Sequence, residues 1–459
     1  MVKGVIDLTS VFTDDNPTRM YLNTLASVLS DGDECAPRGK RILEVRPAVL
    51  EFTNPLNRIT FLRGRRVNPF FNVAECLWIA SGRADVGWLS MFNANMHQFS
   101  DDGVWFNAPY GERLRAYGKN AAHNFIFNPI DQMSDAFTKL TADIDTRQAV
   151  MTISNPMFDH SGYTLGEHGK DVPCNLVITF KIRGNDTEGR HLHMTVFNRS
   201  NDIHWGVFGA NLAQFSTLQE LMLSWMKAYG EEHDLPAYEK LRIGTYTQIT
   251  DSLHLYVEDY GAGATAQVMN AYGISVPGIN VKGELTTATR SKVYSSAEVE
   301  DAIKDCGITF EMLHEPRMSM SKQGFESFLQ RFWSGLNPFL ENDEFLGSTA
   351  SVERILAILT TFPCDDYWGE VVKHLFAYRY IKLCYMEYAM QVLKSCKSSQ
   401  WLVSMMYFTK RFIGKMEASP EKDRVIAMYH EIVQQLAIDL RFQSNANTLR
   451  NYLALDGME

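Results

Sequence analysis

The hydrophobic periodicity of the chain changes near residue 285, and this change limits what the chain can fold into. Before that point strand-like segments, such as 177–182 (VITFKI) and 193–198 (HMTVFN), stand beside helix-like ones, such as 214–230. A glycine-rich stretch over 261–284 follows, and strand signals become scarce beyond it. The pattern predicts an α+β fold for the first part of the chain and an all-helical second part.

Helix signals in the second part set the expected boundary between the two. We expect a first domain over residues 1–289 and an all-helical C-terminal domain over 290–459. Residues 295–298 (SSAE) are typical of a capping box, and Ser419, followed by a proline and a glutamate, is typical of a helix start. Apolar residues then follow at helical spacing, namely Val425, Tyr429, Ile432, Leu436 and Leu440. The methionine and aromatic residues of 405–412 are expected to pack in a core rather than to bind a ligand.

Composition limits the partners of the chain. Its 459 residues are 45% hydrophobic, which is enough to bury a core and excludes disorder throughout. With 54 acidic and 44 basic residues, the net charge of −10 has the wrong sign for coating a phosphate backbone, so we expect no direct nucleic-acid binding. The sequence has no apolar run of about 20 residues that could cross a bilayer. Acidic residues occupy its opening stretch, where a signal peptide would have its apolar core. We therefore expect a cytoplasmic protein without a membrane segment, which binds any anion through local arginines.

The cysteines do not form a recognisable framework. They are Cys35, Cys76, Cys174, Cys306, Cys364, Cys384 and Cys396. Seven is an odd number, and the spacing contains neither a CxxC pair nor a zinc-type combination of cysteine and histidine. We therefore expect no disulfide framework and no metal site, and we expect most of these residues to be small buried hydrophobes.

Two segments combine a thiol with groups that can bind an anion. Cys174 follows a proline at the start of an apolar strand, so its sulfur can point out of the turn towards a cleft. The strand ending at 199–202 (RSND) leads through a glycine-punctuated turn to Asn211 at the head of a helix. Arginine, serine and main-chain amides in such a cluster can bind a phosphate. A cysteine alone is usually structural, but a cation brought into the same pocket would make it a better nucleophile.

Two further segments carry candidate functional side chains. Tyr110, Arg113 and Arg115 lie together in APYGERLR. His254 and Tyr256 alternate with apolar residues, so they are expected to project from one face of a strand. Taken singly, these residues are more often structural than functional.

Seven segments, in order, resemble the thymidylate synthase superfamily. They are AECLWIASG (74–82), YGERLR (110–115), DIDTRQAVMTISNP (143–156), VPCN (172–175), NRSND (198–202), GANLAQFS (209–216) and SLHLY (252–256). The superfamily includes thymidylate synthases and bacteriophage deoxypyrimidylate hydroxymethylases, and the resemblance covers about residues 35–260. It implies a large mixed sheet with flanking helices in a homodimer with shared active sites. Each cleft would bind a pyrimidine nucleoside monophosphate and 5,10-methylenetetrahydrofolate, in the cytoplasm of a host cell if a phage encodes the chain.

The resemblance implies roles for the central residues of the site. Cys174 would be the nucleophile that adds to C6 of the pyrimidine, which makes C5 able to attack the one-carbon unit of the folate. Arg199 and Ser200 would hold the 5′-phosphate. Asp202 would face both the folate and the pyrimidine. Glu75 would organise water and move the proton at C5 and O4.

Other roles carried over from the family concern the edge of the site. Arg147 would reach the phosphate bound to the neighbouring subunit. His254 and Tyr256 would bond the 3′-hydroxyl of the sugar. Tyr110, in the matched YGERLR segment, is a further candidate catalytic residue, and Arg38 is a candidate phosphate ligand whose alternative is an ordinary surface charge.

The sequence also departs from the thymidylate synthase pattern. Gln148 stands where synthases carry a second arginine, and Asn175 stands where they carry a histidine after the nucleophile. The turn after NRSND is one residue longer, so Asn211 is the best match to the base-reading asparagine, although a gapless alignment would place Ala210 there.

The departures bear on the reaction. A segment with His97 and Phe99 replaces the tryptophan that shields the intermediate in synthases, and the family's apolar closing tail is missing. Both differences favour water as the final nucleophile. Asn211 can donate to O4 and accept from N3–H of uracil. The sequence therefore predicts a deoxyuridylate 5-hydroxymethylase, with a thymidylate synthase, a cytidylate hydroxymethylase or a non-catalytic binding or scaffolding module as alternatives.

Overall fold

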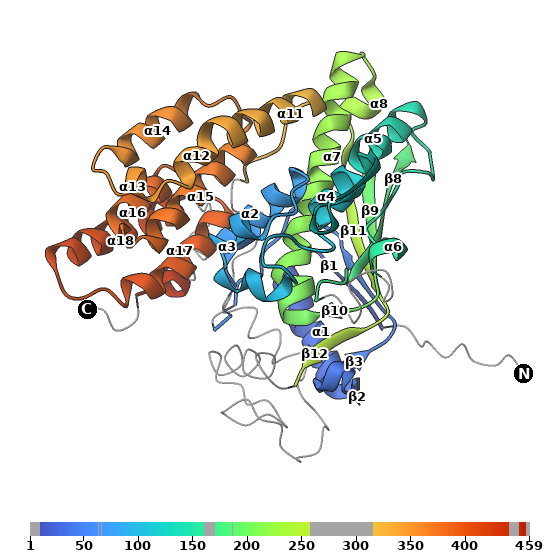
Figure 1. The fold of residues 1–459 in the computed structure, drawn as a ribbon, viewed down its shortest axis with the longest axis horizontal. Helices are drawn as coiled ribbons and strands as arrows, with labels where there is room; N and C mark the ends of the chain where they lie inside the picture. The colour runs from blue at the N-terminus through green and yellow to red at the C-terminus, as the bar shows by residue number, and fades with distance from the viewer. Residues whose placement is uncertain are drawn as a thin grey trace, which may run out of the picture.

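The computed structural model describes residues 10–62, 64–65, 67–159, 170–185, 187–257, 315–439 and 449–455. A six-stranded mixed sheet forms the centre of the first part (Figure 1). In spatial order its strands are β1 (Ser10–Asp14), β4 (Ala48–Phe52), β11 (Arg242–Thr250), β9 (Gly189–Asn198), β8 (Asn175–Asn185) and β7 (Val150–Thr152). The segments 177–182 and 193–198 lie within β8 and β9, so both predicted strands are confirmed.

One face of this sheet is buried and the other is not. On β9, Leu192, Met194 and Val196 are buried, while the alternate residues Thr195 and Phe197 keep part of their surface exposed. This period of two is what a strand with one core face requires. The sheet therefore has a core face and a second face that is partly open.

A smaller sheet lies below the first in Figure 1. Its spatial order is β10 (Asn201–Asp202), β12 (Leu253–Tyr256), β3 (Ile42–Val45) and β2 (Asp33–Cys35), and a separate hairpin joins β5 (Tyr117–Asn120) to β6 (Phe125–Ile130). β10 and β12 run parallel, with Asp202 opposite His254. This pairing brings two of the predicted site residues side by side.

The first part also contains α-helices, several of which pack against the large sheet. They are α1 (Pro17–Asp31), α2 (Pro69–Ala80), α3 (Val86–Ser90), α4 (Tyr110–Arg115), α5 (Gln132–Ala142), α6 (Pro156–Asp159), α7 (Leu212–Glu232) and α8 (Pro236–Glu239). α7 contains the helix predicted over 214–230 and lies against β9 and β11. Gln219 ties it to the sheet by donating from Nε2 to the carbonyl oxygen of Leu192 at 2.9 Å. The sheet with its helices confirms the predicted α+β fold.

The described residues from 315 onwards are helical. The helices are α11 (Lys322–Arg331), α12 (Asn337–Leu340), α13 (Asp343–Leu346), α14 (Ser351–Thr361), α15 (Asp366–Lys382), α16 (Met386–Lys394), α17 (Gln400–Ile413) and α18 (Pro420–Asp439), with a π-helical turn at Phe332–Leu336. Ser419 caps α18 as predicted, because its Oγ accepts from the Lys422 N–H at 3.2 Å. The proposed boundary at 289/290, the 295–298 capping box and Leu440 lie outside the described residues.

The predicted core of the second part is confirmed. On α18, the four predicted core residues that lie within the described part of the chain are buried, namely Val425, Tyr429, Ile432 and Leu436. On α17, Met405, Met406 and Phe408 are buried, and Tyr407 and Phe412 pack against the same core. These methionine and aromatic side chains are therefore packing residues.

Helix α2 joins the two parts of the molecule. In Figure 1 it lies between α7 on one side and α15 and α17 on the other. Every residue of α2 is buried except Glu75. Phe70 of α2 contacts Tyr378 and Phe408, with ring centroids 5.1 and 5.7 Å apart. The buried apolar residues of both parts consequently form one continuous cluster.

Polar contacts reinforce this junction. Arg58 forms a buried ion pair with Glu220 of α7, and its backbone N–H donates to Oε1 of Gln400 at 2.8 Å. Gln400 in turn donates from Nε2 to the carbonyl oxygen of Leu56 at 2.6 Å, and its own N–H donates to Glu315 at 2.6 Å. Because these groups are buried and partnered, separating the two parts would leave charges and amides without partners.

The cysteines correct one expectation, because most of those described are not fully buried. Cys76 is buried, Cys384 is exposed, and the others are half-buried, namely Cys35, Cys174, Cys364 and Cys396. Several lie at the ends of strands or helices, where the chain turns towards the surface. Cys306 lies outside the described residues. None of the helices that the structure describes is long and apolar enough to cross a membrane.

Candidate active site

The thiol of Cys174 lies beside an arginine and a serine, as the sequence predicted. Cys174 occupies the turn before β8, and Arg199 and Ser200 follow the end of the paired strand β9. The Arg199 N–H donates to the carbonyl oxygen of Cys174 at 2.9 Å, which fixes the two turns together. The Cys174 sulfur lies 3.6 Å from Nη2 of Arg199 and 3.5 Å from Oγ of Ser200.

Main-chain carbonyls orient the Arg199 side chain. Its Nε donates to the carbonyl oxygen of Pro173 and its Nη2 to that of Val172, each at 3.0 Å. The residue is nevertheless exposed, so part of the guanidinium is accessible to a ligand. A fixed guanidinium and a hydroxyl beside a sulfur can stabilise a thiolate and also bind a phosphate dianion.

Behind this thiol, buried amides form a hydrogen-bond network. Asn175 donates from Nδ2 to the hydroxyl of Tyr110 at 2.9 Å. Asn211 donates to Oδ1 of Asn201 at 3.1 Å, with Oδ1 of Asn175 at 3.4 Å. Gln248 of β11 accepts from Asn201 and, at 3.1 Å, from Asn198. Such a network holds its members in single orientations, because an unpaired buried amide is costly.

A π-helix leads from β10 into α7. It spans Ile203–Asn211, a segment that the sequence predicted to be a glycine-punctuated turn, so that expectation was wrong. A π-helical turn holds more residues than an α-helical one. A Cβ on Gly206 would lie 2.2 Å from Oδ1 of Asn201, so only glycine fits there. Asn211 is buried within the amide network, while Ala210 is half-buried. The role of Asn211 as the base-reading residue stays a prediction.

Glu75 is the single residue of α2 that is not fully buried. Its Oε2 atom is itself shielded from solvent and has no hydrogen-bond partner among the described residues. Burial raises the pKa of Glu75 to about 7, and a hydrogen bond with the Gln214 side chain offsets this only in part. A carboxyl group that titrates near neutral pH can both accept and return a proton.

Asp202 lies at the junction of β10 and the π-helix. Its Oδ1 accepts from the Trp205 N–H, whereas its buried Oδ2 has no partner among the described residues. Burial raises the pKa of Asp202, and the nearby His254 counters part of this rise. An unpaired buried acceptor of this kind suits an N–H donor of a bound ligand.

His254 and Tyr256 lie together on β12, as predicted. The rings of His254 and Tyr256 pack edge to face, with centroids 5.2 Å apart. Ser252 lies next to them, with its Oγ 3.4 Å from Nδ1 of His254. Since His254 is also opposite Asp202, these side chains extend the site along the smaller sheet.

Among the described residues, two candidate ligands form no hydrogen bond or ion pair with this cluster. Arg147 is in the turn between α5 and β7, and Arg38 is in a 3₁₀ turn at Pro37–Gly39, with a left-handed φ of 54°. Both are exposed. Their roles as phosphate ligands therefore stay predictions.

The two arginines of APYGERLR are structural. Arg113 is fully buried and forms an ion pair with Asp159 at 2.7 Å. Arg115 pairs with Asp131 at 3.1 Å and with Glu326 of α11. These carboxylate partners occupy the guanidinium groups, so of the three side chains singled out in that segment only Tyr110 reaches the cluster around Cys174.

Sequence reasoning missed the contributions of Asn201 and Gln248 to the site. A signal was present, because asparagines stand at 175, 198, 201 and 211 beside segments already singled out. Their spacing shows no period that would bring them together. The pairing of β8 with β9 sets Asn175 opposite Asn198, while Asn201 lies on β10 and Asn211 at the end of the π-helix.

Comparison with known proteins agrees with this arrangement. The sequence profile of the family described as "Thymidylate synthase" matches residues 19–299. A deoxyuridylate hydroxymethyltransferase of Bacillus phage SP01 is 44% identical over 358 residues, covering 78% of this chain and 82% of that protein. This aligned length exceeds the profile match, so the likeness continues outside residues 19–299.

Two other relatives match a smaller share of the chain. A deoxyuridylate hydroxymethyltransferase of Pseudomonas phage M6 is 35% identical, covering 46% of this chain and 51% of that protein. A thymidylate synthase of Haemophilus influenzae (strain PittEE) is 28% identical, covering 44% of this chain and 71% of that protein. The profile matches more than half of the chain, and the relative from phage SP01 aligns along most of both lengths. This chain therefore belongs to the thymidylate synthase family.

Proposed function

We propose that the chain is a deoxyuridylate 5-hydroxymethylase, a one-carbon transferase that converts dUMP to 5-hydroxymethyl-dUMP. The observation that carries this proposal is the position of the Cys174 sulfur within 3.6 Å of both Arg199 and Ser200. The names of the phage relatives support the same substrate and product. A protein that kept the fold only for binding would not need a thiol at the phosphate-binding groups.

The first step belongs to Cys174. Its thiolate adds to C6 of the uracil ring, so that a sulfur–carbon bond forms and the electron pair of the C5–C6 double bond moves towards O4. C5 thereby becomes nucleophilic. Arg199 and Ser200 hold the 5′-phosphate and so fix the distance between C6 and the sulfur.

Glu75 and Asp202 serve the steps at the other side of the ring. Glu75, whose pKa is about 7, gives a proton to O4 as charge develops there and takes it back when the ring carbonyl re-forms. The proton that leaves C5 passes to water held by Glu75. In the last step the sulfur–C6 bond breaks, which restores the C5–C6 double bond and releases the Cys174 thiolate. Asp202 would hold the ring of 5,10-methylenetetrahydrofolate through its unpaired Oδ2. When bound, that folate supplies the one-carbon unit that C5 receives.

The product depends on which nucleophile reaches the new carbon. A hydride gives a methyl group, and water gives a hydroxymethyl group. In this chain the segment that replaces the synthase tryptophan forms a 3₁₀ helix, Ala94–Phe99, on which His97 and Phe99 are both exposed at the surface. Side chains that face solvent do not form a shield against water, which favours the hydroxymethyl product.

With dUMP and methylenetetrahydrofolate, the purified protein is expected to form 5-hydroxymethyl-dUMP and tetrahydrofolate. Mass spectrometry of the nucleotide and absorbance of the folate product would measure both. Formation of dTMP with an equal amount of dihydrofolate would instead identify a thymidylate synthase. Failure to release tritium from C5-labelled dUMP would support the non-catalytic alternative.

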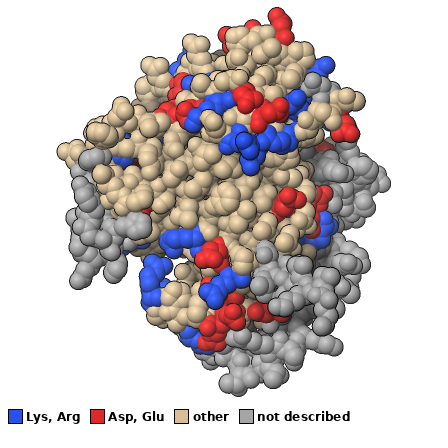
Figure 2. Space-filling view, turned by 90° about the vertical axis from the view of Figure 1, so that its right-hand side faces the viewer, with Lys and Arg blue, Asp and Glu red and all other residues tan. Residues whose placement is uncertain are grey.

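We further propose a homodimer that shares its active sites, built on the open face of the large sheet. Figure 2 shows a broad region free of charged side chains on the side of the molecule that carries this sheet in Figure 1. Phe197 on β9 and Val150 on β7 are each more than a third exposed there. A second copy stacked on this face would cover them, and it would bring its Arg147, next to β7, towards the phosphate site of its partner.

Base choice gives a further prediction. In Asn211→Asp, activity on dUMP is expected to fall and some activity on dCMP to appear, because a carboxylate accepts from the cytosine amino group and no longer donates to O4. One mispaired buried hydrogen bond costs roughly 1–3 kcal/mol, or about ten- to a hundredfold in specificity. The ratio of kcat/KM for the two nucleotides measures the change. A preference for dCMP in the unsubstituted protein would exclude this role for Asn211.

A further inference from the structure

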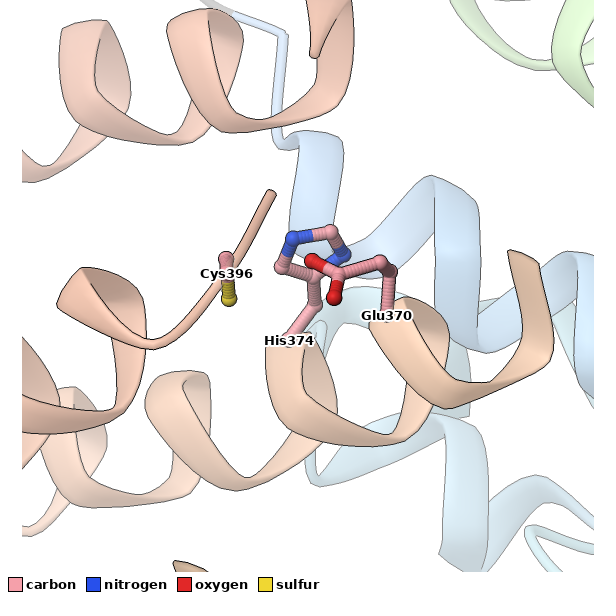
Figure 3. Close-up of side chains that lie close together, drawn as sticks. All are labelled: Glu370, His374 and Cys396. Carbon is pink, nitrogen blue, oxygen red and sulfur yellow. The ribbon is translucent and has the colours of Figure 1, made fainter. Parts of the chain in front are cut away.

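Three potential metal ligands meet inside the helical part, far in sequence from the active site. They are Glu370 and His374 of α15 and Cys396, which follows α16 (Figure 3). Their ligand atoms all lie within 4.8 Å of one another. Glu370 and His374 are one helical turn apart and so project from the same face of α15, towards the thiol.

His374 is the most informative member of this group. Its side chain is 1% exposed, and neither Nδ1 nor Nε2 has a hydrogen-bond partner among the described residues. Burial and the neighbouring Lys373 lower its pKa to about 3, so the ring is neutral near pH 7. A buried neutral imidazole with two unpartnered nitrogens is costly, because one nitrogen has lost an acceptor and the other a donor. Figure 3 shows the ring beside the carboxylate and facing the sulfur.

The carboxylate of Glu370 is already held in place. Its Oε1 accepts from Nζ of Lys373 at 2.7 Å, and its Oε2 accepts from the Lys397 N–H at 2.9 Å. A carboxylate has about four acceptor positions, so these two bonds leave room for a cation. In metal sites, hydrogen bonds of this type hold the ligand side chains in the orientation that binds the ion.

We propose that Glu370, His374 and Cys396 bind a zinc ion. The combination of one sulfur, one imidazole nitrogen and one carboxylate oxygen suits Zn²⁺, which accepts all three donor types in a tetrahedral arrangement. In such a site, with bonds of about 2.0–2.3 Å, donors lie roughly 3.3–3.8 Å apart. Small side-chain movements would therefore close the present cluster onto the ion. A water molecule or a small ligand would take the fourth position.

The position of the cluster indicates what the ion would do. It would fasten α15 to the turn that follows α16. The helices α15 and α16 themselves pack against each other. Tyr378, one helical turn beyond His374 on α15, contacts Phe70 of α2. The zinc site would thus stiffen the helix that supports α2, at a distance from the residues that perform the chemistry. This role is independent of which nucleotide the active site uses.

The test is a zinc titration of the full-length protein after treatment with a chelator. Equilibrium dialysis with metal analysis is expected to give one tightly bound Zn²⁺ per chain. Cys396→Ser and His374→Asn are each expected to weaken binding by about tenfold or more. With Co²⁺ as the probe, a sulfur-to-metal absorption band should appear and should be absent in Cys396→Ser. Far-UV circular dichroism of the metal-free variants would confirm that they are folded.

Matched controls separate this site from incidental binding. Cys364→Ser changes another half-buried cysteine of the helical part, and His430→Asn changes an exposed histidine of α18. Cys174→Ser removes the thiol of the active site. All three variants should still bind one Zn²⁺ with unchanged affinity. Absence of stoichiometric zinc in the unsubstituted protein would overturn the proposal, and so would zinc binding that survives in Cys396→Ser. Because Cys396 is half-buried and serine nearly isosteric with it, that variant stays decisive if His374→Asn does not fold.

Discussion

Replacing Cys174 with alanine is expected to abolish turnover and the release of the C5 proton, with a loss of about a thousandfold or more, because no other group can form the bond to C6. Binding of dUMP should persist, since Arg199 and Ser200 remain. Tritium release from C5-labelled dUMP and equilibrium dialysis with the nucleotide measure these two properties separately.

The exposed thiol of Cys384 provides the control for this experiment. Cys384→Ala should retain nearly full activity, because that residue is far along the chain in the helical part and carries no predicted role. Activity in Cys174→Ala close to that of the unsubstituted protein would rule out covalent catalysis by this residue, whatever the product.

Mixing two inactive variants is expected to restore activity if the sites are shared. One chain carries Cys174→Ala and the other Arg147→Ala, and each homodimer lacks a necessary group at both sites. In a heterodimer, one site regains both the thiol and the partner's arginine. With random exchange, about a quarter of the normal number of sites should become active.

Two observations make this outcome interpretable. Native mass spectrometry must show that the subunits exchange, and mixing Cys174→Ala with itself must restore nothing. If heterodimers form and stay inactive, each site is built from one chain, and the exposed Arg147 has no role across the interface.

The elements of the fold that carry a strong period were predictable. β8, β9, α7 and the capped start of α18 are all at the predicted positions, because alternation with a period of two or near four directly reflects which side chains face a core. The meeting of Cys174 with Arg199 was predictable for a different reason. Ordered motifs, each weak alone, identified a family in which these two turns lie together.

Other features could not be read from the sequence. The π-helix at Ile203–Asn211 has no periodicity of its own, since its wide turn is imposed by the segments that it connects. The amide network needs three strands to be paired before Asn175, Asn201 and Gln248 can meet. The cluster at Glu370 joins two residues of one helix to a cysteine beyond the next helix, a combination that no common zinc spacing describes.

The burial of the cysteines was misjudged for a simpler reason. The average tendency of a thiol to be buried says nothing about where along an element it stands. Cys384, for example, follows the end of α15 with a positive φ of 65°, in a turn that faces solvent.

The central position of α2 has a consequence for the synthesis of the protein. This helix is made early, yet part of its apolar surface is covered by α15 and α17, which leave the ribosome roughly 300 residues later. Until then the nascent chain would carry Phe70 and its neighbours uncovered, a surface of the kind that chaperones bind and that aggregates when left open. A frameshift or stop codon late in the gene would therefore release a chain that keeps Cys174 and the residues around it but leaves part of the apolar surface of α2 uncovered.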